Sequence, residues 1–318
     1  RTVELLDTVA NLVERDGIDA WFDLDPRTLI GADAEHYDKV TDVLDVWYDS
    51  GVTHACVLDA RAELSRAHGD VRGVMYLEGS DQHRGWFQSS LLTSVAMHGR
   101  APYDEVITYG FTVDPQGRKM SKSLGNVVAP ETVMKTLGAD ILRLWVASTD
   151  YSAEIAVSDE ILKRVADSYR RLRNTLRFVL GNLAGFTEAE KVAPADMPEL
   201  EQLMLHRLAE LDELVRNGYD EFEFRKITKA LMDFMVVELS AFYFDIRKDS
   251  LYCDAPSSAK RKASMEVVRH LFNCLVTWTA PLLPFTAEEA WLDRYKNKTS
   301  VHLEQFPDIP GDWKNEAL

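Results

Sequence analysis

The sequence contains few cysteines, and no two of them have the spacing of a metal site. Cys56, Cys253 and Cys274 lie far apart, and none belongs to a C-x-x-C motif. A sparse, odd set of three argues against a disulfide framework and against a structural zinc site, and it suits a reducing compartment. We therefore expect a cytoplasmic protein with no zinc site and no other metal bound by its own side chains.

Long hydrophobic runs are also missing. No stretch approaches the roughly 18 consecutive apolar residues that a transmembrane helix requires, so we expect no membrane partner. No secretory signal is visible, and the chain begins at Arg1 rather than Met, which fits a piece of a longer protein.

Positive charge is scarce overall. The formal net charge is −16, which taken alone counts against nucleic acid as a partner. Phosphate binding depends on local positive potential, however, and a net figure averages that potential away. With 318 residues, 46% of them hydrophobic and 28% charged, the chain has the size and composition of two ordinary globular domains.

The pattern of apolar residues changes near residue 150. Before it, strand-like runs at Val74–Leu77 and Val106–Tyr109 flank a helical stretch over residues 82–97. Strands that alternate with helices predict an α/β fold with a partial, Rossmann-like parallel sheet, whose ligands lie at the carboxyl ends of the strands. We assign residues 1–150 to this domain.

Residues 151–318 predict an all-α helical bundle. Ser158 is a plausible N-cap for a long helix whose apolar residues recur every three or four positions. Further helices are predicted over residues 199–217, 221–248 and 257–280. A capping box of Thr286 and Glu289 predicts the start of a short helix, and Val301–Leu303 predicts a short strand.

One loop combines two lysines with small and hydroxyl-bearing residues. It follows the turn-like residues Asp114–Gly117 and runs from Arg118 to Asn126. Lys119 and Lys122 lie three positions apart, so this loop can close over a triphosphate and offset the charge of departing pyrophosphate. The alternative interpretation is a solvated basic turn.

Two other segments are candidates for ligand binding. Gly79–Gln82 lies where a buried strand turns into a helix, and a helix N-terminus can hold anionic or hydroxyl groups. Asp81 is otherwise simply a good N-cap. Trp47 and Trp86 are flat, largely apolar side chains that can bracket an aliphatic ligand, or else they are ordinary core residues.

These segments resemble one family. Lys119–Ser123 reads KMSKS, the signature of class I aminoacyl-tRNA synthetases. Asp45–Gly51 and Tyr76–Gln88 are similar to the isoleucyl enzymes, as is Gly138–Ser148 beyond the lysine loop. Ala280–Glu289 resembles the anticodon-binding bundle of the isoleucyl, valyl, leucyl and methionyl enzymes. Residues 1–150 would then be the second half of the catalytic Rossmann domain plus a stem-contact junction, and residues 151–318 the anticodon-binding domain.

The resemblance implies an isoleucine–tRNA ligase. Such an enzyme joins isoleucine to ATP, giving isoleucyl-adenylate and pyrophosphate, and passes the isoleucyl group to tRNA(Ile). Lys119 and Lys122 would stabilise the pyrophosphate together with substrate-bound Mg²⁺, and Trp47 and Trp86 would shape the isoleucine pocket. The residues implied to bind ATP or the adenylate are Glu78, Gly79, Asp81, Gln82, Met120, Ser121 and Ser123.

A group of arginines on the long helix is the candidate tRNA contact. Arg170, Arg173 and Arg177 recur at three- and four-residue steps and so share one face. Such a stripe can follow a phosphate backbone. The alternative is a solvated face paired with neighbouring carboxylates.

The chain departs from the family pattern in one large respect. No His-x-Gly-His motif is present, and Tyr109 stands where related enzymes often carry histidine. We therefore expect a fragment, nearly inactive alone, whose partner is the missing N-terminal part of the same enzyme. The alternatives are a tRNA-binding module without catalysis, the corresponding part of a valyl or leucyl enzyme, and another α/β nucleotidyltransferase with a helical cap.

Overall fold

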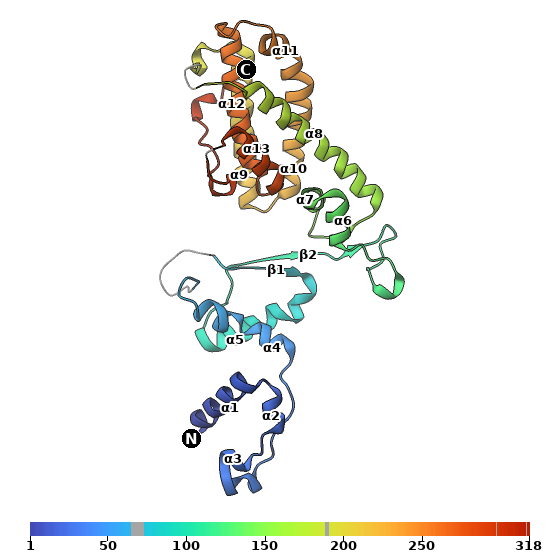
Figure 1. Cartoon of the computed structure of the whole chain (residues 1–318), viewed down its shortest axis with the longest axis vertical. Coiled ribbons are helices and arrows are strands. Elements are labelled where there is room, and N and C mark those ends of the chain that lie inside the picture. Colours follow the sequence, from blue (N-terminus) through green and yellow to red (C-terminus); the bar gives the residue numbers. More distant parts are fainter. Residues whose placement is uncertain (65–72, 188–190, 297, 316) are drawn as a thin grey trace. The chain divides into compact units, whose positions relative to one another are not determined.

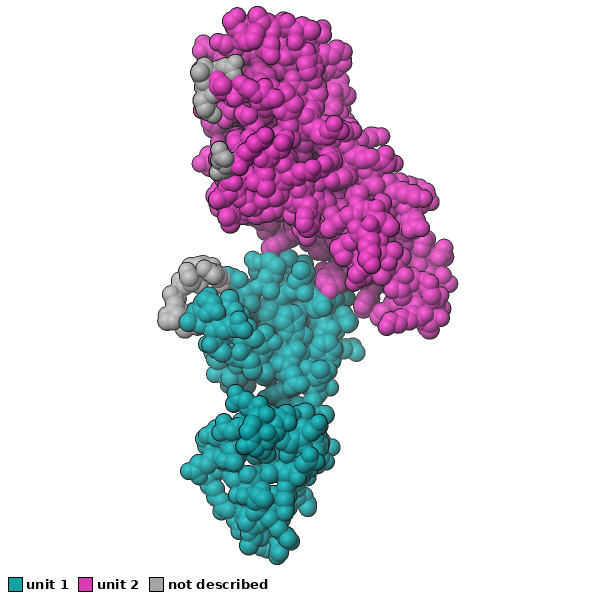
Figure 2. Space-filling model, in the orientation of Figure 1, with its two compact units in different colours: residues 1–107 teal, residues 108–318 magenta. Residues whose placement is uncertain are grey.

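The computed structural model describes residues 1–64, 73–187, 191–296, 298–315 and 317–318. The chain divides into two compact units, residues 1–107 and residues 108–318, which Figure 2 colours teal and magenta. Figure 1 labels helices α1 to α13 and strands β1 and β2. The domain boundary predicted at residue 150, where the pattern of apolar residues changes, stays a prediction.

Unit 1 begins with short helices and ends with a two-stranded sheet. Its helices are α1 (Thr2–Asp16), α2 (Asp19–Asp23), α3 (Arg27–Ile30), α4 (Val46–Gly51) and α5 (Trp86–His98), with the short helical turns η1 (Gly31–His36), η2 (His54–Asp59) and η4 (Ser80–Arg84). Strands β1 (Met75–Gly79) and β2 (Glu105–Tyr109) pair with each other. Both predicted strands are therefore present. The predicted helix over 82–97 begins as a 3₁₀ turn and becomes α-helical only at Trp86.

Helices α4 and α5 pack closely because a glycine lies between them. A Cβ added to Gly51 would lie 2.6 Å from the Ser89 hydroxyl oxygen, which is too close for any real contact. Only glycine allows this approach. The approach holds the segment that carries Trp47 against the helix that begins at Trp86.

The first part of unit 2 contains a second small sheet. Strands β3 (Thr112–Val113) and β4 (Ile155–Ala156) pair in parallel, with Thr112 opposite Ile155. Between them lie η5 (Lys122–Leu124), α6 (Pro130–Leu137) and α7 (Ala139–Ala147). The described chain thus has small sheets with helices followed by a mostly helical region, which confirms the predicted fold class, although each sheet has two strands only.

The rest of unit 2 is a helical bundle (Figure 1). Its elements are α8 (Asp159–Leu183), η7 (Pro194–Asp196), α9 (Glu199–Asp220), α10 (Phe224–Asp233), η8 (Phe234–Tyr243), α11 (Phe244–Tyr252), α12 (Ala259–Thr279), α13 (Pro284–Arg294), η9 (Val301–Leu303) and η10 (Gly311–Trp313). Ser158 caps α8 as predicted, since its hydroxyl accepts a hydrogen bond from the Ile161 amide at 3.2 Å. The apolar stripe of α8 packs on α12, and Val179, Leu208 and Leu271 are fully buried in the shared core.

Three local predictions in the bundle were wrong or incomplete. The stretch predicted as one helix over 221–248 contains a π-helical segment, η8, where the Ser240 hydroxyl donates to the Met235 carbonyl at 2.9 Å. Val301–Leu303 is a 3₁₀ turn rather than a strand. Thr286 and Glu289 do not form a capping box, because α13 begins earlier, at Pro284.

Thr286 instead joins two helices. Its amide and its hydroxyl both donate to the buried Asp140 carboxylate of α7, at 2.8 and 2.6 Å. Arg143, one turn further along α7, donates to the carbonyls of Pro281 and Leu282. These contacts fix the start of α13 against α7. No helix among the described residues is both long and apolar enough to cross a bilayer.

Candidate functional site

The lysine loop is supported at its base by one buried carboxylate. Asp114 accepts hydrogen bonds from the Gln116 and Arg118 amides at 3.0 and 2.9 Å, and from the Arg118 guanidinium at 2.8 Å. The Asn126 side-chain amide donates to the same carboxylate at 3.0 Å. Asp114 is only 4% exposed. The Asn126 bond is the largest cause that holds the pKa of Asp114 well below its usual value, so this carboxyl stays ionised.

Asn126 connects the two ends of the loop. While its amide nitrogen donates to Asp114, its amide oxygen accepts from the Ser121 backbone N–H at 2.9 Å. Ser121 in turn caps η5, because its hydroxyl accepts from the Leu124 amide at 3.2 Å. The turn closes at Gly125, whose φ of +63° is accessible to glycine at little cost. The loop is therefore held by specific bonds.

The two predicted lysines have different surroundings in this hydrogen-bonded loop. Lys119 forms an antiparallel bridge with Val113, and its ammonium lies 4.0 Å from the centre of the Phe111 ring. Lys122 begins η5 and is exposed. Met120, between them, packs against a small core that includes Val133, which anchors the middle of the loop. Ser123 lies 3.1 Å from Ser121, hydroxyl to hydroxyl.

The Gly79–Gln82 segment lies at the end of β1, as predicted. Gly79 is buried as the last residue of the strand, Glu78 is half-buried, and Asp81 is exposed. The Gln82 side-chain oxygen accepts the Trp86 amide hydrogen at 3.0 Å, so Gln82, and not Asp81, satisfies the first free N–H of α5. This leaves the Asp81 carboxylate on the surface at the strand end.

The two tryptophans lie near one another at the start of α5. The Trp86 ring stacks on Tyr76 with centroids 4.0 Å apart, and its indole N–H donates to the Ser50 carbonyl at 3.0 Å. Trp47 follows the α4 N-cap Asp45 and is 41% exposed. A Cβ on Gly85, the residue just before Trp86, would lie 3.3 Å from the Trp47 ring, so the Trp47 ring lies close to the start of α5. Trp86 is held by a ring stack and a hydrogen bond, whereas Trp47 is partly open to solvent.

The predicted arginine stripe is partly neutralised by the chain itself. Arg173 makes a bidentate contact with Glu289, at 2.6 and 2.9 Å, which raises the pKa of Arg173 and lowers that of Glu289. Arg170 pairs with Asp167 on the same helix. Arg177 is exposed, and the described residues supply it with no ion pair. The three side chains share a helix but differ in how much charge they offer a ligand.

The sequence locates the lysine loop but does not reveal the contacts that support it. Asp114 was interpreted only as a turn residue and Asn126 only as part of the loop string. Their spacing of twelve positions carries no recognised pattern. The buried bonds of Asp140 to Thr286 were likewise missed. The lysine loop belongs to unit 2 and Gly79–Gln82 to unit 1, and convergence of the two on one nucleotide stays a prediction.

Comparison with known families agrees with these local geometries. Residues 1–158 match the model of class I tRNA synthetases (I, L, M and V), and residues 201–318 match the anticodon-binding domain of tRNA ligases. The chain belongs to the class I aminoacyl-tRNA synthetase family. The first match contains both the lysine loop and the Trp47 and Trp86 segments, and the second covers α9 to the end of the bundle.

Curated relatives match nearly the whole chain. An isoleucine–tRNA ligase of Mesorhizobium japonicum is 62% identical over 312 residues, covering 98% of this chain and 31% of the relative. One of Brucella abortus is 57% identical over 312 residues, covering 98% and 32%. The chain thus spans about a third of the length of these relatives.

Solved structures share the fold at lower identity. A LeuRS of Agrobacterium radiobacter K84, in a ternary complex with tRNA and LeuAMS, matches with a TM-score of 0.70 and 22% identity, covering 87% of this chain and 34% of that chain. A Mycobacterium tuberculosis methionyl-tRNA synthetase bound to methionyl-adenylate matches with a TM-score of 0.60 and 20% identity, covering 83% and 56%. These likenesses concern the fold alone.

Proposed function

We propose that this chain is part of an isoleucine–tRNA ligase, which activates isoleucine with ATP and transfers it to tRNA(Ile). The observation that carries the proposal is the KMSKS loop braced by Asp114 and Asn126, in a chain 62% identical along 98% of its length to an isoleucine–tRNA ligase. A protein that charges tRNA belongs in the cytoplasm, as the sparse cysteines also indicate.

Activation is an in-line displacement at the α-phosphorus of ATP. The isoleucine carboxylate attacks, pyrophosphate leaves, and no protein nucleophile is required, so positioning and charge stabilisation supply most of the catalysis. Lys119 and Lys122 offset the charge that grows on the leaving pyrophosphate. The frame of Asp114 and Asn126 holds the loop in shape before ATP arrives, so less ordering is needed during reaction.

Mg²⁺ enters as part of the ATP substrate. The buried carboxylate at the base of the lysine loop, Asp114, already accepts four hydrogen bonds and does not fit the role of a metal ligand. The Asp114 carboxylate instead positions the lysine loop.

The segments of unit 1 hold the other end of the adenylate. Asp81 is exposed at the end of β1 and can accept hydrogen bonds from ribose hydroxyls, with Gly79 allowing close approach of the backbone. Glu78 and Gln82 contact the adenylate or its amino group. The open face of Trp47 and the fixed ring of Trp86 bracket the isoleucine side chain.

A chimera tests this function directly. The 312 matching residues of the Mesorhizobium japonicum relative are replaced by this chain, and amino-acid-dependent ATP–pyrophosphate exchange is measured with isoleucine, valine and leucine. We expect exchange with isoleucine, weaker exchange with valine and none with leucine, and almost no exchange by the 318-residue chain alone. A folded chimera that prefers valine or leucine would overturn the assignment to isoleucine.

A tRNA-binding module is the second candidate. The match of residues 201–318 to an anticodon-binding domain favours it. In that case the 318-residue chain binds tRNA(Ile) while the folded chimera shows no exchange with any amino acid.

A further inference from the structure

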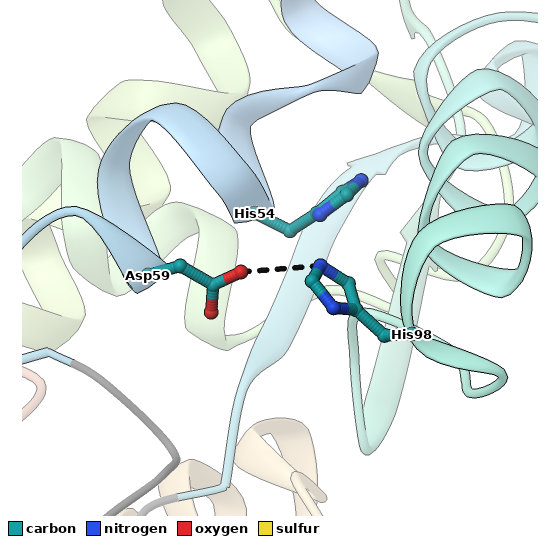
Figure 3. A group of neighbouring side chains, drawn as sticks. All are labelled: His54, Asp59 and His98. Atoms are coloured by element: carbon teal, nitrogen blue, oxygen red, sulfur yellow. Dashed lines mark ion pairs between the residues drawn. The ribbon is translucent and has the colours of Figure 1, made fainter.

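Three side chains of unit 1 form a cluster that the proposed function does not use. His54 and Asp59 are the first and last residues of η2, and His98 is the last residue of α5 (Figure 3). One potential ligand atom from each lies within 4.8 Å of the others. The His98 Nε2 and Asp59 Oδ2 atoms are 3.1 Å apart, and the His54 and His98 rings meet edge to face with centroids separated by 5.5 Å.

The π-helical geometry of η2 makes the cluster possible. Residues five positions apart in an α-helix point about 140° away from each other, because each residue turns the chain by about 100°. The wider turn of a π-helix, with bonds between residues five apart, brings such positions back toward one face. His54 and Asp59 have this spacing and face the same neighbour, His98.

The hydrogen bonds of His54 define which of its nitrogens is available. His54 Nε2 lies 3.0 Å from the Thr93 hydroxyl oxygen, and the Ser89 carbonyl lies 2.8 Å from the same oxygen. Because the Thr93 hydroxyl can donate its proton to Ser89, we assign the ring proton of His54 to Nε2, which leaves a lone pair on Nδ1. His54 is only 3% exposed, and its Nδ1 atom is buried without a hydrogen-bond partner.

A buried nitrogen lone pair that has no hydrogen-bond partner, beside a second imidazole and a carboxylate, can bind a metal ion. A ligand histidine commonly donates its other ring N–H to a neighbouring acceptor, as His54 does to Thr93. Figure 3 shows one His54 nitrogen on the side of the Asp59 carboxylate and the His98 nitrogen.

We infer that His54, Asp59 and His98 form a binding site for a divalent transition-metal ion of the zinc class. Two nitrogens and one carboxylate oxygen suit Zn²⁺ and disfavour Mg²⁺ and Ca²⁺, which prefer oxygen ligands alone. Bond lengths of 2.0–2.2 Å place tetrahedral ligand atoms about 3.4 Å apart. The Asp59–His98 pair, at 3.1 Å, is close to this separation, and the His54 atom, which lies within 4.8 Å of both, moves toward them when the ion binds. Water supplies the fourth ligand, because Asp59 and His98 are partly exposed.

Such an ion would clamp η2 to the end of α5. η2 follows α4, which carries Trp47, and α5 begins at Trp86. An ion that joins η2 to α5 therefore stabilises the region around both tryptophans without contacting either ring. Cysteine spacing predicted no zinc site. It remains untested, and ligands from two helices far apart in the sequence leave no comparable pattern.

The test is a titration of the tag-free, metal-stripped 318-residue chain with Co²⁺, a spectroscopic substitute for Zn²⁺. We expect saturable visible absorption of a tetrahedral complex at one equivalent, loss of that absorption on adding Zn²⁺, and a higher melting temperature with Zn²⁺. His98→Gln and Asp59→Asn change surface residues, and each should weaken binding at least about tenfold. His36→Gln removes an exposed histidine of the same unit, and Cys56→Ser removes the neighbouring thiol, and neither should change binding.

Two outcomes overturn the inference. One is the absence of a tetrahedral spectrum in the folded wild-type chain at micromolar Co²⁺. The other is binding that His98→Gln and Asp59→Asn leave unchanged, or that Cys56→Ser abolishes, because the ion would then be held elsewhere. Neither outcome bears on isoleucine activation, which the chimera tests independently.

Discussion

The Asn126 side chain donates a hydrogen bond to the buried Asp114 carboxylate at 3.0 Å and so joins the two ends of the lysine loop. Asp114 precedes the loop and Asn126 ends it. A flexible loop that carries two lysines would have to be ordered each time ATP binds, at a cost in conformational entropy for every residue fixed. Because the Asp114–Asn126 contact already orders part of the loop in the folded protein, less conformational entropy is lost when ATP binds.

Removing either side of this contact should slow activation without preventing amino-acid binding. In the chimera, Asp114→Ala or Asn126→Ala is expected to lower the kcat of isoleucine-dependent pyrophosphate exchange by about 10- to 100-fold, since small displacements of catalytic groups are costly. The KM for isoleucine should change little. Gln116→Ala is the matched control, because only the backbone of Gln116 bonds to Asp114. Equal rates in all three variants would show that the contact does not position the lysines.

The arginines of α8 should differ in their effect on tRNA binding. Arg177→Ala is expected to weaken binding of tRNA(Ile) to the 318-residue chain and to reduce the slope of log affinity against log salt by about 1. Arg173→Ala should lower the melting temperature instead, since Arg173 is paired with Glu289. Arg164→Ala is the control on the same helix, because Arg164 is paired with Glu160. Filter binding at several salt concentrations checks this, and an Arg177→Ala variant that binds as the wild type does would contradict it.

Glu266 should make the bundle sensitive to acid. Burial would raise the pKa of Glu266, but hydrogen bonds from His270 and Arg269 outweigh burial and lower this pKa from 4.5 to about 2. A depressed folded-state pKa contributes stability that is present above pH 4.5 and is lost as pH falls toward 2. The difference in unfolding free energy between wild type and Glu266→Gln should therefore shrink over that window. Urea denaturation at several pH values measures it, with the exposed Glu131→Gln as the control, and a difference independent of pH would contradict the assignment.

The buried pair of Glu201 and Arg247 should be important for the stability of the bundle. Glu201 is fully buried and accepts two bonds from the Arg247 guanidinium, at 2.6 and 2.8 Å, and one from the Ser264 hydroxyl at 2.9 Å. Glu201→Ala leaves a buried guanidinium unpaired and is expected to cost about 3–5 kcal/mol in unfolding free energy. The double variant Glu201→Leu with Arg247→Met should cost less. Chemical denaturation of both variants checks this, and equal losses would contradict it.

The sequence predicted what depends on local pattern. The periodic apolar residues of α8 and the Ser158 cap predicted that helix, and the contiguous KMSKS string located the lysine loop. The contacts of Asp114 with Asn126, and of Asp140 with Thr286, were not predictable, because they join residues that no periodicity relates. The π-helical segments were missed because their hydrogen bonding depends on packing partners, such as Thr175 beside Ser240. The capping box at Thr286 was wrong because α13 begins earlier, at Pro284, and the Thr286 amide and hydroxyl donate to the tertiary partner Asp140.

The most direct test of the central claim is the effect of Lys122→Ala on isoleucine-dependent ATP–pyrophosphate exchange in the folded chimera. If Lys122 stabilises the departing pyrophosphate, kcat should fall by about 100- to 1,000-fold, the usual loss for one such electrostatic contact, while the KM for isoleucine stays nearly constant. A Lys122→Ala chimera that exchanges pyrophosphate at the rate of the unmodified chimera would contradict a catalytic role for the lysine loop.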